Sequence, residues 1–313
     1  MTPPTAPPPS GEQFEISLGE QRATLVEVGG GVRAYTVGDR DVLHPYHLNA
    51  ICDGAHGTPL VPWPNRISDG TYTFDGTSQQ LALTEPDKHN AIHGLLRWRN
   101  WQLVEHATDR VVLAARLHPC PGYPFSLDVH VEYALTDHGL AATTTATNMG
   151  DFPCPYGHGQ HPYLSPGTGL IDACQLQFTA DTRITTDPQR QLPTGTEQVA
   201  GTAYDFSRPR PLGGLNIDFA FTGLATDPDG LAWVRLTGAD GATAALWVDQ
   251  SYPIIELYTA DTLAPERRRS GLGTEPMTCP PNAFQSGEQV IRLEPGQTHT
   301  TRWGAQLTSP EVR

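Results

Sequence analysis

Paired cysteines are missing from this sequence of 313 residues. It has five cysteines, an odd number, and no two of them are spaced as Cys-x-x-Cys. A secreted disulfide framework needs paired cysteines and a zinc knuckle needs closely spaced ligands, so both classes are excluded. The sequence therefore predicts reduced, mostly buried thiols and a cytoplasmic location. The five are Cys52, Cys120, Cys154, Cys174 and Cys279.

Positive charge and long apolar runs are also scarce. Lys and Arg total 20 against 34 Asp and Glu, which gives a formal net charge of −14. Such a field repels polyanions, so nucleic acid and anionic membrane surfaces are not expected as partners. No run approaches the roughly 18 apolar residues of a membrane-spanning helix. A neutral small molecule meets no such barrier, whereas a phosphorylated one needs a local basic pocket.

The first twelve residues, MTPPTAPPPSGE, lack the basic and apolar regions of a secretory signal. Their proline content instead predicts a disordered tail over residues 1–12. The remaining residues, 13–313, show no internal repeat and no linker-like change of composition. We therefore expect them to form a single domain.

Room for helices is limited, because 31 glycines and 29 prolines interrupt the chain. A typical helix needs about 11–12 residues, and the longest stretch without Gly or Pro, 95–118, is broken by a polar, turn-like segment at 106–110. Residues 129–135 instead alternate large apolar side chains with others, as half-buried strands do. Residues 244–248 and 254–258 are apolar enough for central strands. Many short strands predict an all-β sandwich or barrel.

Two nearby segments carry candidate binding residues. Arg66 follows a turn bracketed by Pro62 and Pro64, which aims its guanidinium at a ligand or at solvent. His93 precedes Gly94, where a backbone or a ligand can approach closely. Taken singly, each of the two fits a structural or surface role better than a functional one.

Three further candidates are acid–base groups. His158 and His161 are three residues apart, and on a strand such residues face opposite sides, so we expect no metal site. One of them as a catalytic acid is the better interpretation, because histidine titrates near neutrality. Glu275 precedes a proline and is expected to be extended, as a general base or as a solvated loop acid. Asp218, between apolar neighbours, fits sugar binding and solvent exposure equally well.

The sequence lacks the motifs of two large enzyme classes. There is no glycine loop for phosphates, no nucleotide fingerprint and no Gly-x-Ser-x-Gly elbow. Nucleotide cofactors and serine acyl transfer are therefore not expected, and the candidate chemistry rests on the acid–base groups alone.

Five segments, in order between about residues 60 and 285, resemble motifs of the aldose 1-epimerase (mutarotase) family. They are Asn65-Arg66-Ile67, Asn90-Ala91-Ile92-His93-Gly94, His161-Pro162-Tyr163-Leu164, Asp218-Phe219-Ala220-Phe221, and Glu275-Pro276-Met277-Thr278 with Asn282-Ala283-Phe284. The resemblance implies a large antiparallel β-sandwich, the galactose mutarotase-like supersandwich. It also implies that the chain interconverts the anomers of a free aldose without a cofactor or metal, as a monomer or homodimer.

The resemblance further implies a role for each matching residue. Glu275 is expected as the base and His161 as the acid, whereas Asn65, Arg66, His93 and Asp218 are expected to bind the sugar. Two positions depart from the family pattern, namely Gln160, where the family has Asn, and Leu164, where it has an aromatic residue. These departures make galactose itself a less secure substrate. For stacking on a sugar face, the sequence offers Trp63, Trp98 or Trp247 without choosing between them.

Three alternatives remain open at this point. A hexose 6-phosphate mutarotase would use Arg267-Arg268-Arg269 as a phosphate clamp, although such a run is more often a solvated loop. A non-catalytic sugar-binding protein would share the fold, although it needs no acid–base pair. A glycoside hydrolase needs two carboxylates about 5–9.5 Å apart, for which Glu275 and Asp218 are the candidates.

Overall fold

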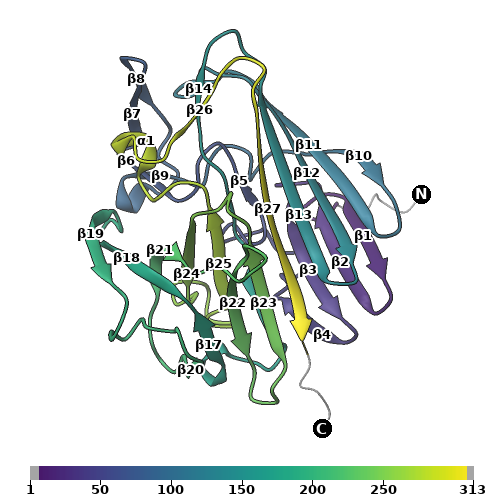
Figure 1. Cartoon of the computed structure of the whole chain (residues 1–313). Helices are drawn as coiled ribbons and strands as arrows, with labels where there is room; N and C mark the ends of the chain where they lie inside the picture. The colour runs from purple at the N-terminus through teal and green to yellow at the C-terminus, as the bar shows by residue number, and fades with distance from the viewer. Residues whose placement is uncertain (1–6, 309–313) are drawn as a thin grey trace.

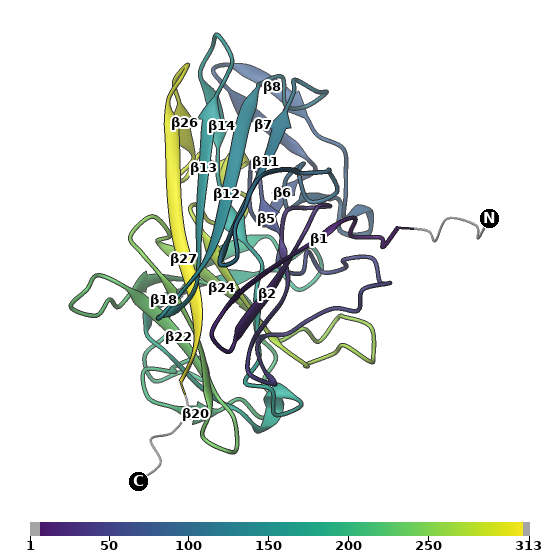
Figure 2. The ribbon, with the colours of Figure 1, turned by 90° about the vertical axis from the view of Figure 1, so that its right-hand side faces the viewer.

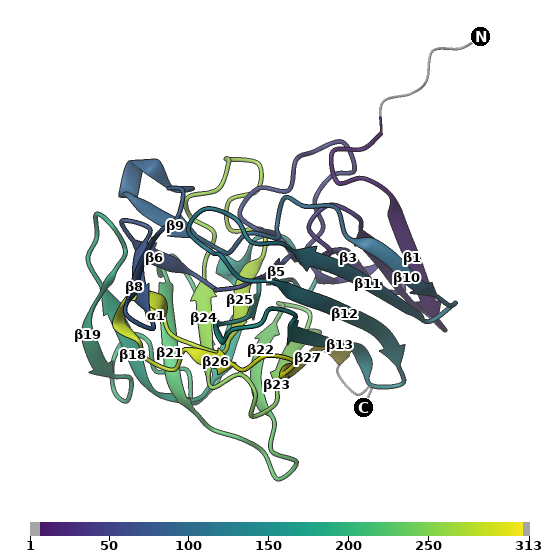
Figure 3. The same cartoon turned by 90° about the horizontal axis from the view of Figure 1, so that it is seen from above.

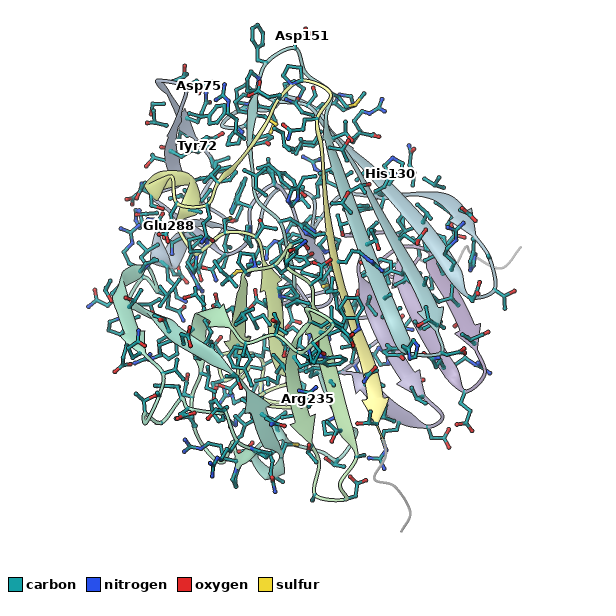
Figure 4. The ribbon with its side chains drawn as sticks, in the orientation of Figure 1. Tyr72, Asp75, His130, Asp151, Arg235 and Glu288 are labelled. Atoms are coloured by element: carbon teal, nitrogen blue, oxygen red, sulfur yellow. The ribbon has the colours of Figure 1, made fainter. Side chains whose placement is uncertain are left out.

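Strand β12 (Leu127–Thr136) shows how the alternating pattern becomes a two-faced sheet. The computed structural model describes residues 7–308, and in it Val129, Val131 and Tyr133 of this strand are fully buried. The residues between them are half-buried and face outward. Figure 4 shows one of these, His130, on the outside of the molecule. The predicted half-buried strand at 129–135 is thus confirmed.

Strand β12 belongs to a nine-stranded antiparallel sheet, in which β12, β13 and β27 are the longest strands and lie side by side (Figures 1 and 2). The hairpin of β10 and β11 is formed by the long segment without Gly or Pro, and its turn falls in the predicted segment at 106–110. In spatial order the strands are β10 (Gln102–His106), β11 (Arg110–Leu117), β12, β13 (Gly139–Asn148), β27 (Thr298–Thr308), β23 (Thr243–Val248), β22 (Ala232–Thr237), β17 (Gln175–Phe178) and β20 (Arg210–Pro211).

A second antiparallel sheet of twelve strands packs against the first. Ten strands follow one path, and β15 (Gly159–Gln160) and β5 (Pro59–Leu60) attach beside β25. The path runs β1 (Gln13–Leu18), β2 (Gln21–Val26), β3 (Val32–Val37), β4 (Arg40–Leu43), β16 (Tyr163–Leu164), β25 (Leu272–Met277), β24 (Ile254–Tyr258), β21 (Asp218–Leu224), β18 (Ala180–Thr186) and β19 (Pro193–Gln198).

Three two-stranded ribbons and three short helical turns complete the described residues. The ribbon of β6 and β9, with helix α1, lies on the side that carries β21, β24 and β25, away from β1 and β10 (Figure 3). The ribbons are β6 (Arg66–Ser68) with β9 (Asn90–Ile92), β7 (Thr71–Phe74) with β8 (Thr77–Gln80), and β14 (Cys154–Tyr156) with β26 (Ile291–Leu293). The helical turns are η1 (Pro86–Lys88), η2 (Ile171–Ala173) and α1 (Ala283–Ser286).

One hydrophobic core fills the space between the two large sheets. It runs continuously from Phe14 near the start of the described chain to Ala305 near its end. Polar links cross it as well, because Tyr133 donates a hydrogen bond to the Gly30 carbonyl (2.9 Å) and accepts one from the Gln160 amide (3.0 Å). The expected all-β fold, a large antiparallel β-sandwich, is confirmed.

The segment just before β1 packs onto the sheet. The Ser10 carbonyl accepts a hydrogen bond from the Val28 amide at 2.9 Å, and the Ser10 side chain is buried. Gly11 closes a turn on the Pro8 carbonyl at 2.9 Å. The expected disorder over residues 1–12 therefore does not hold for residues 7–12, because backbone hydrogen bonds hold them. Residues 1–6 lie outside the described residues.

Helical structure within residues 7–308 is confined to turns of three or four residues. None of these described helices has the length and apolarity needed to cross a membrane.

Candidate active site

Strand register brings three ionisable side chains into one row. Gly159 pairs with Met277 and Tyr163 with Gly273, so His161, midway between them, lies opposite Glu275 of β25. On the other side of β25, Glu275 pairs directly with Glu256 of β24. Residues opposite one another on neighbouring strands project from the same face. Although 114 positions separate His161 from Glu275 in the sequence, the sheet makes them neighbours.

The β6–β9 ribbon supplies the next group of side chains. Arg66 pairs with Ile92 across this ribbon, which places Asn65 and His93 together at its end. The Asn65 carbonyl accepts the backbone N–H of His93 at 3.0 Å, and the Asn65 N–H is donated to Nδ1 of His93 at 3.2 Å. The two segments that resembled separate motifs are therefore one structural unit.

A cavity of about 230 Å³ lies between the ribbon and this row of sheet residues. Its volume is below the roughly 300–1,000 Å³ of pockets for drug-sized ligands, which suits a single small molecule. All six residues expected from the sequence line it: Asn65, Arg66, His93, His161, Asp218 and Glu275. The remaining lining includes Glu85, Lys88, Arg97, Tyr163, Gln191, Glu256 and Tyr258.

The contact between His161 and Glu275 is the centre of the site. Nε2 of His161 lies 3.1 Å from Oε1 of Glu275, and both side chains are buried. Burial lowers the pKa of His161 to about 3, with a further contribution from His56, whereas burial and the charge of Asp218 raise the pKa of Glu275 well above its usual value. Burial favours the neutral forms and the short contact favours the ion pair. At pH values between the pKa of His161 and the pKa of Glu275, the neutral pair and the ion pair each hold one titratable proton.

His93 presents a donor to the cavity. Because Nδ1 accepts the Asn65 N–H, the neutral ring carries its proton on Nε2. Burial, together with the charges of His161, Arg97 and Arg66, holds the pKa of His93 well below its usual range. The ring stays neutral, and its Nε2–H is available to a ligand oxygen.

Arg66 is held in place by two protein partners. Its Nε and Nη2 donate to the two carboxylate oxygens of Glu85 at 2.8 and 3.0 Å, and Nη2 also donates to Gln191 at 2.9 Å. Nη1 has no hydrogen-bond partner within residues 7–308. Gln191 also donates to the Asp218 carboxylate, so a single glutamine links Arg66 and Asp218, two of the four expected sugar-binding residues.

The Asn65 side chain is occupied by the protein itself. Its amide donates to Oε2 of Glu256 at 2.6 Å, and its Oδ1 accepts the backbone N–H of Arg66 at 2.8 Å. These two bonds fix Glu256 and Arg66 relative to each other. Sugar binding by Asn65 stays a prediction.

The two histidines of the His-x-x-His segment point to different places. Nδ1 of His158 contacts the hydroxyls of Tyr252 (2.8 Å) and Thr301 (3.1 Å), away from the cavity. A different set could accept a metal, because one ligand atom each from His93, His161 and Glu275 lies within 4.8 Å of the others. Two imidazoles and a carboxylate form a donor set that Zn²⁺ accepts.

Three features of the cavity were not predicted from the sequence. Glu256 lies within the apolar stretch at 254–258, where an acid on an otherwise apolar strand was the available signal. Arg97, four residues after His93, gave no motif signal. The aromatic lining consists of Tyr163 and Tyr258. Tyr163 stacks on the His161 ring with centroids 4.9 Å apart.

The tryptophans offered for stacking lie elsewhere. Trp63 is buried against Phe284, with ring centroids 5.7 Å apart. Trp98 is half exposed, and Trp247 lies on β23 in the other sheet. None of the three lines the cavity, so the suggestion that one of them stacks on the sugar is wrong.

Two arginines of the run at 267–269 already have ion-pair partners. Arg267 pairs with Asp53 and contacts His56, and Arg269 pairs with Asp172 and Asp261 at 2.9 Å each. No residue of the run lines the cavity. The alternative of a phosphate clamp at these residues is therefore wrong, because none of them reaches the cavity and the charges of Arg267 and Arg269 hold loops together.

The two departures from the family pattern face the core. The Gln160 amide donates to the Gly57 carbonyl and to the Tyr133 hydroxyl, each at 3.0 Å. Leu164 is fully buried in the main hydrophobic cluster. Neither residue lines the cavity, so both substitutions change the packing beneath the site and leave its lining unchanged.

Comparison with known proteins gives one consistent result. The family model for aldose 1-epimerase matches residues 12–306. The uncharacterized protein YihR of Escherichia coli (strain K12) is 35% identical, over 93% of this chain and 91% of its own. Galactose mutarotase of Sus scrofa is 26% identical, over 93% and 92%. A solved GalM/aldose epimerase homologue from C. elegans superposes with a TM-score of 0.84 at 20% identity, covering 95% and 99%. The chain belongs to the aldose 1-epimerase family.

Proposed function

We propose that this protein is a mutarotase, which interconverts the α and β anomers of a monosaccharide by opening and closing its ring. The buried contact between His161 and Glu275 at the wall of a small polar cavity carries this proposal. Anomer exchange needs one group that removes the proton of the C1 hydroxyl and one that protonates the ring oxygen. Two acid–base groups 3.1 Å apart supply both within one site.

In the proposed reaction, Glu275 takes the proton from the C1 hydroxyl while His161 gives a proton to the ring oxygen. The bond between C1 and the ring oxygen breaks, and C1 becomes an aldehyde. Rotation about the C1–C2 bond exposes the other face of the aldehyde. The ring hydroxyl then attacks that face, His161 recovers its proton and Glu275 returns one to the new C1 hydroxyl. The protein ends with the protons with which it began.

This cycle needs one proton in the pair before the sugar binds. A pair without this proton has no acid to protonate the ring oxygen. A pair with a second proton has no base to accept the proton of the C1 hydroxyl. The pKa of His161 is depressed and that of Glu275 is raised. A wide pH range therefore separates the low pH at which the pair gains a second proton from the high pH at which it loses the shared one. Over this range the pair carries a single proton, and the reaction uses the form in which that proton is on His161 and Glu275 is ionised.

The other cavity residues are assigned to the sugar hydroxyls. His93 donates from Nε2, and Arg66 donates from Nη1, which its bonds to Glu85 leave free. Asp218 accepts, since a carboxylate held by Gln191 keeps further lone pairs. In this proposal these donors and acceptors hold the ring so that C1 reaches Glu275.

Polarimetry of freshly dissolved α-D-glucose and α-D-galactose tests the proposal, with wild type, Glu275→Gln and His161→Asn. Wild type should speed the approach to anomeric equilibrium. Each variant should lose about 10²–10⁴-fold in kcat, the usual contribution of a positioned acid–base group. His130→Asn, on the outer face of β12, is the matched control.

A wild-type rate equal to that of buffer, on these sugars and on anionic ones, would remove the proposal. Calorimetric binding without any acceleration would point instead to a sugar-binding protein of the same fold. Full activity in Glu275→Gln would leave the cavity in place and overturn the role of the pair.

A further inference from the structure

Arg97 is the one cation of the described cavity lining that has no anionic partner. Arg66 and Lys88 also line the cavity, and both pair with Glu85, at 2.8 and 3.2 Å. The Arg97 guanidinium makes no hydrogen bond or ion pair within residues 7–308, and it lies 5.1 Å from the centroid of the Trp98 ring. Its side chain is half-buried. Up to five N–H donors are thus directed at nothing in the protein.

A half-buried cation without a partner is costly. Desolvation by burial lowers the pKa of Arg97, so the site itself disfavours the charge it holds. Arginine nevertheless stays protonated. A ligand anion at this position would offset the cost, and a planar guanidinium binds carboxylate, phosphate and sulfate oxygens through paired hydrogen bonds.

A neutral sugar leaves this arginine without a function. The proposed function assigns the hydroxyls to Asp218, His93 and Arg66, all of which line the cavity. The molecule carries a net charge of −14, so it repels anions at long range and must hold any anionic ligand through a local cation. Arg97 is the available local cation.

Arg97 can be placed relative to the ring oxygen of the sugar in the proposed reaction. In the proposed reaction His161 protonates that oxygen, and its ring neighbour C5 carries the exocyclic carbon of a hexopyranose. Arg97 lines the same cavity as His161 and His93, whose ring centroids lie 5.4 Å apart. A substituent on the exocyclic carbon would therefore lie on the His161 side of the sugar, within the cavity that Arg97 lines.

We propose that the substrates of this mutarotase are monosaccharides with an anionic oxygen-rich group on the exocyclic carbon, and that Arg97 binds that group. This inference rests on the proposed function and names its substrate class. It replaces the clamp expected at residues 267–269 with one arginine on the cavity wall.

Saturation-transfer NMR at anomeric equilibrium measures the exchange rate of any reducing sugar and so tests the inference. The sugars are glucose, glucose 6-phosphate, glucose 6-sulfate and glucuronate, which separate dianion, monoanion and carboxylate. At least one anionic sugar should exceed glucose in kcat/KM by 50-fold or more. Raising NaCl from 0.05 to 0.5 M should reduce this preference.

The variant Arg97→Gln should lower the ratio of anionic to neutral kcat/KM by about 10–100-fold, the usual size of a charge-assisted contact. Arg97→Lys keeps the charge without the fork and should retain part of the preference. The control is Arg99→Gln, the same substitution at an exposed arginine two residues away, which should leave the ratio unchanged.

An unchanged ratio in Arg97→Gln, or glucose as good a substrate as every anionic sugar, would overturn the inference and leave the mutarotase proposal intact. If no sugar is accelerated, the mutarotase proposal fails. Calorimetric titration of the same sugars into wild type and Arg97→Gln then decides the role of Arg97, since equal affinities would refute it.

Discussion

Asp218, Glu256 and Glu275 place three carboxyl groups around one small cavity. Burial raises the pKa of Glu256 and of Glu275 well above their usual values, and the charge of Asp218 adds to both shifts. Among the charges acting on Glu275, that of Arg66 works in the opposite direction. The pKa of the proposed base is therefore tuned by an acid and an arginine that are both proposed to bind the sugar.

This coupling predicts the behaviour of Asp218→Asn. The shared proton of the pair is lost as pH rises through the raised pKa of Glu275, so the rate of mutarotation should fall there. Removing the charge of Asp218 lowers that pKa, and the alkaline fall should move to lower pH. Loss of the charged acceptor should also reduce kcat/KM by about 10–100-fold. A pH–rate profile of kcat/KM measures both effects.

Asp229→Asn, in an exposed turn, is the matched control and should keep the wild-type profile. The coupling would be disproved by an Asp218→Asn profile that is lower in rate at every pH but unmoved along the pH axis. Such a result would leave Asp218 as a sugar-binding residue only.

At the scale of elements, the site depends on the backbone conformation of the two residues that follow strand β9. His93 and Gly94 both have positive φ, 61° and 69°. A Cβ on Gly94 would lie 2.1 Å from the Val61 carbonyl oxygen, so only glycine fits there. This close approach sets the direction of His93, whose ring lines the cavity.

Gly94→Ala should therefore damage both stability and function. We expect a loss of about 3 kcal/mol in the free energy of unfolding, from the clash added to the positive-φ strain, and a fall in kcat/KM because His93 shifts. Gly76→Ala is the control, since its φ is 74° but no atom lies within 4 Å of the added Cβ. Strain alone should cost about 1 kcal/mol there. Urea denaturation compares the two, and equal losses would contradict the role of the close approach.

Features of this structure that depend on neighbouring residues can be predicted from the sequence, whereas features that depend on strands far apart in the chain cannot. Alternation at 129–135 is local and predicted a strand with one buried face, which β12 has. The row of His161, Glu275 and Glu256 depends on the register of strands far apart along the chain, which no local pattern specifies. Motif resemblance supplied His161 and Glu275, whereas Glu256 lay hidden within an apolar strand.

Arg97 illustrates a second limit. A charged residue shortly after a turn is ordinary in sequence, and its significance lies in the partners it lacks. The opposite holds for the run at 267–269, which was conspicuous in sequence and is fully engaged in ion pairs at Arg267 and Arg269. Pairing of charges is a property of the folded chain, so the sequence alone revealed neither the free arginine nor the paired ones.

For the whole molecule, the buried histidines determine how the fold responds to acid. Burial lowers the pKa to about 4 in His44 and to about 3 in His56, His158 and His161, and well below its usual range in His93. In the unfolded chain each titrates near 6.5. Below that pH the unfolded state binds protons that the folded state does not, so stability is lost as pH falls.

The two carboxyl groups with raised pKa values oppose this loss of stability at acidic pH. Glu256 and Glu275 hold protons in the folded state that the unfolded chain releases above about pH 4.5, so they favour the fold as pH falls toward that value. With five histidines against two carboxyls, the unfolded chain binds about three more protons between pH 6 and pH 4.5. This corresponds to about 4 kcal/mol lost per pH unit.

A domain stabilised by about 5–10 kcal/mol, in the lower part of the usual range, should therefore unfold between about pH 5 and pH 4. Urea denaturation at several pH values measures the slope. His158→Gln should reduce the slope by about one proton, because this histidine is buried outside the cavity, against the hydroxyls of Tyr252 and Thr301. His138→Gln, at an exposed turn, should leave it unchanged. A stability that stays level from pH 7 to pH 5, or a slope that His158→Gln does not alter, would show that these histidines are protonated in the folded state.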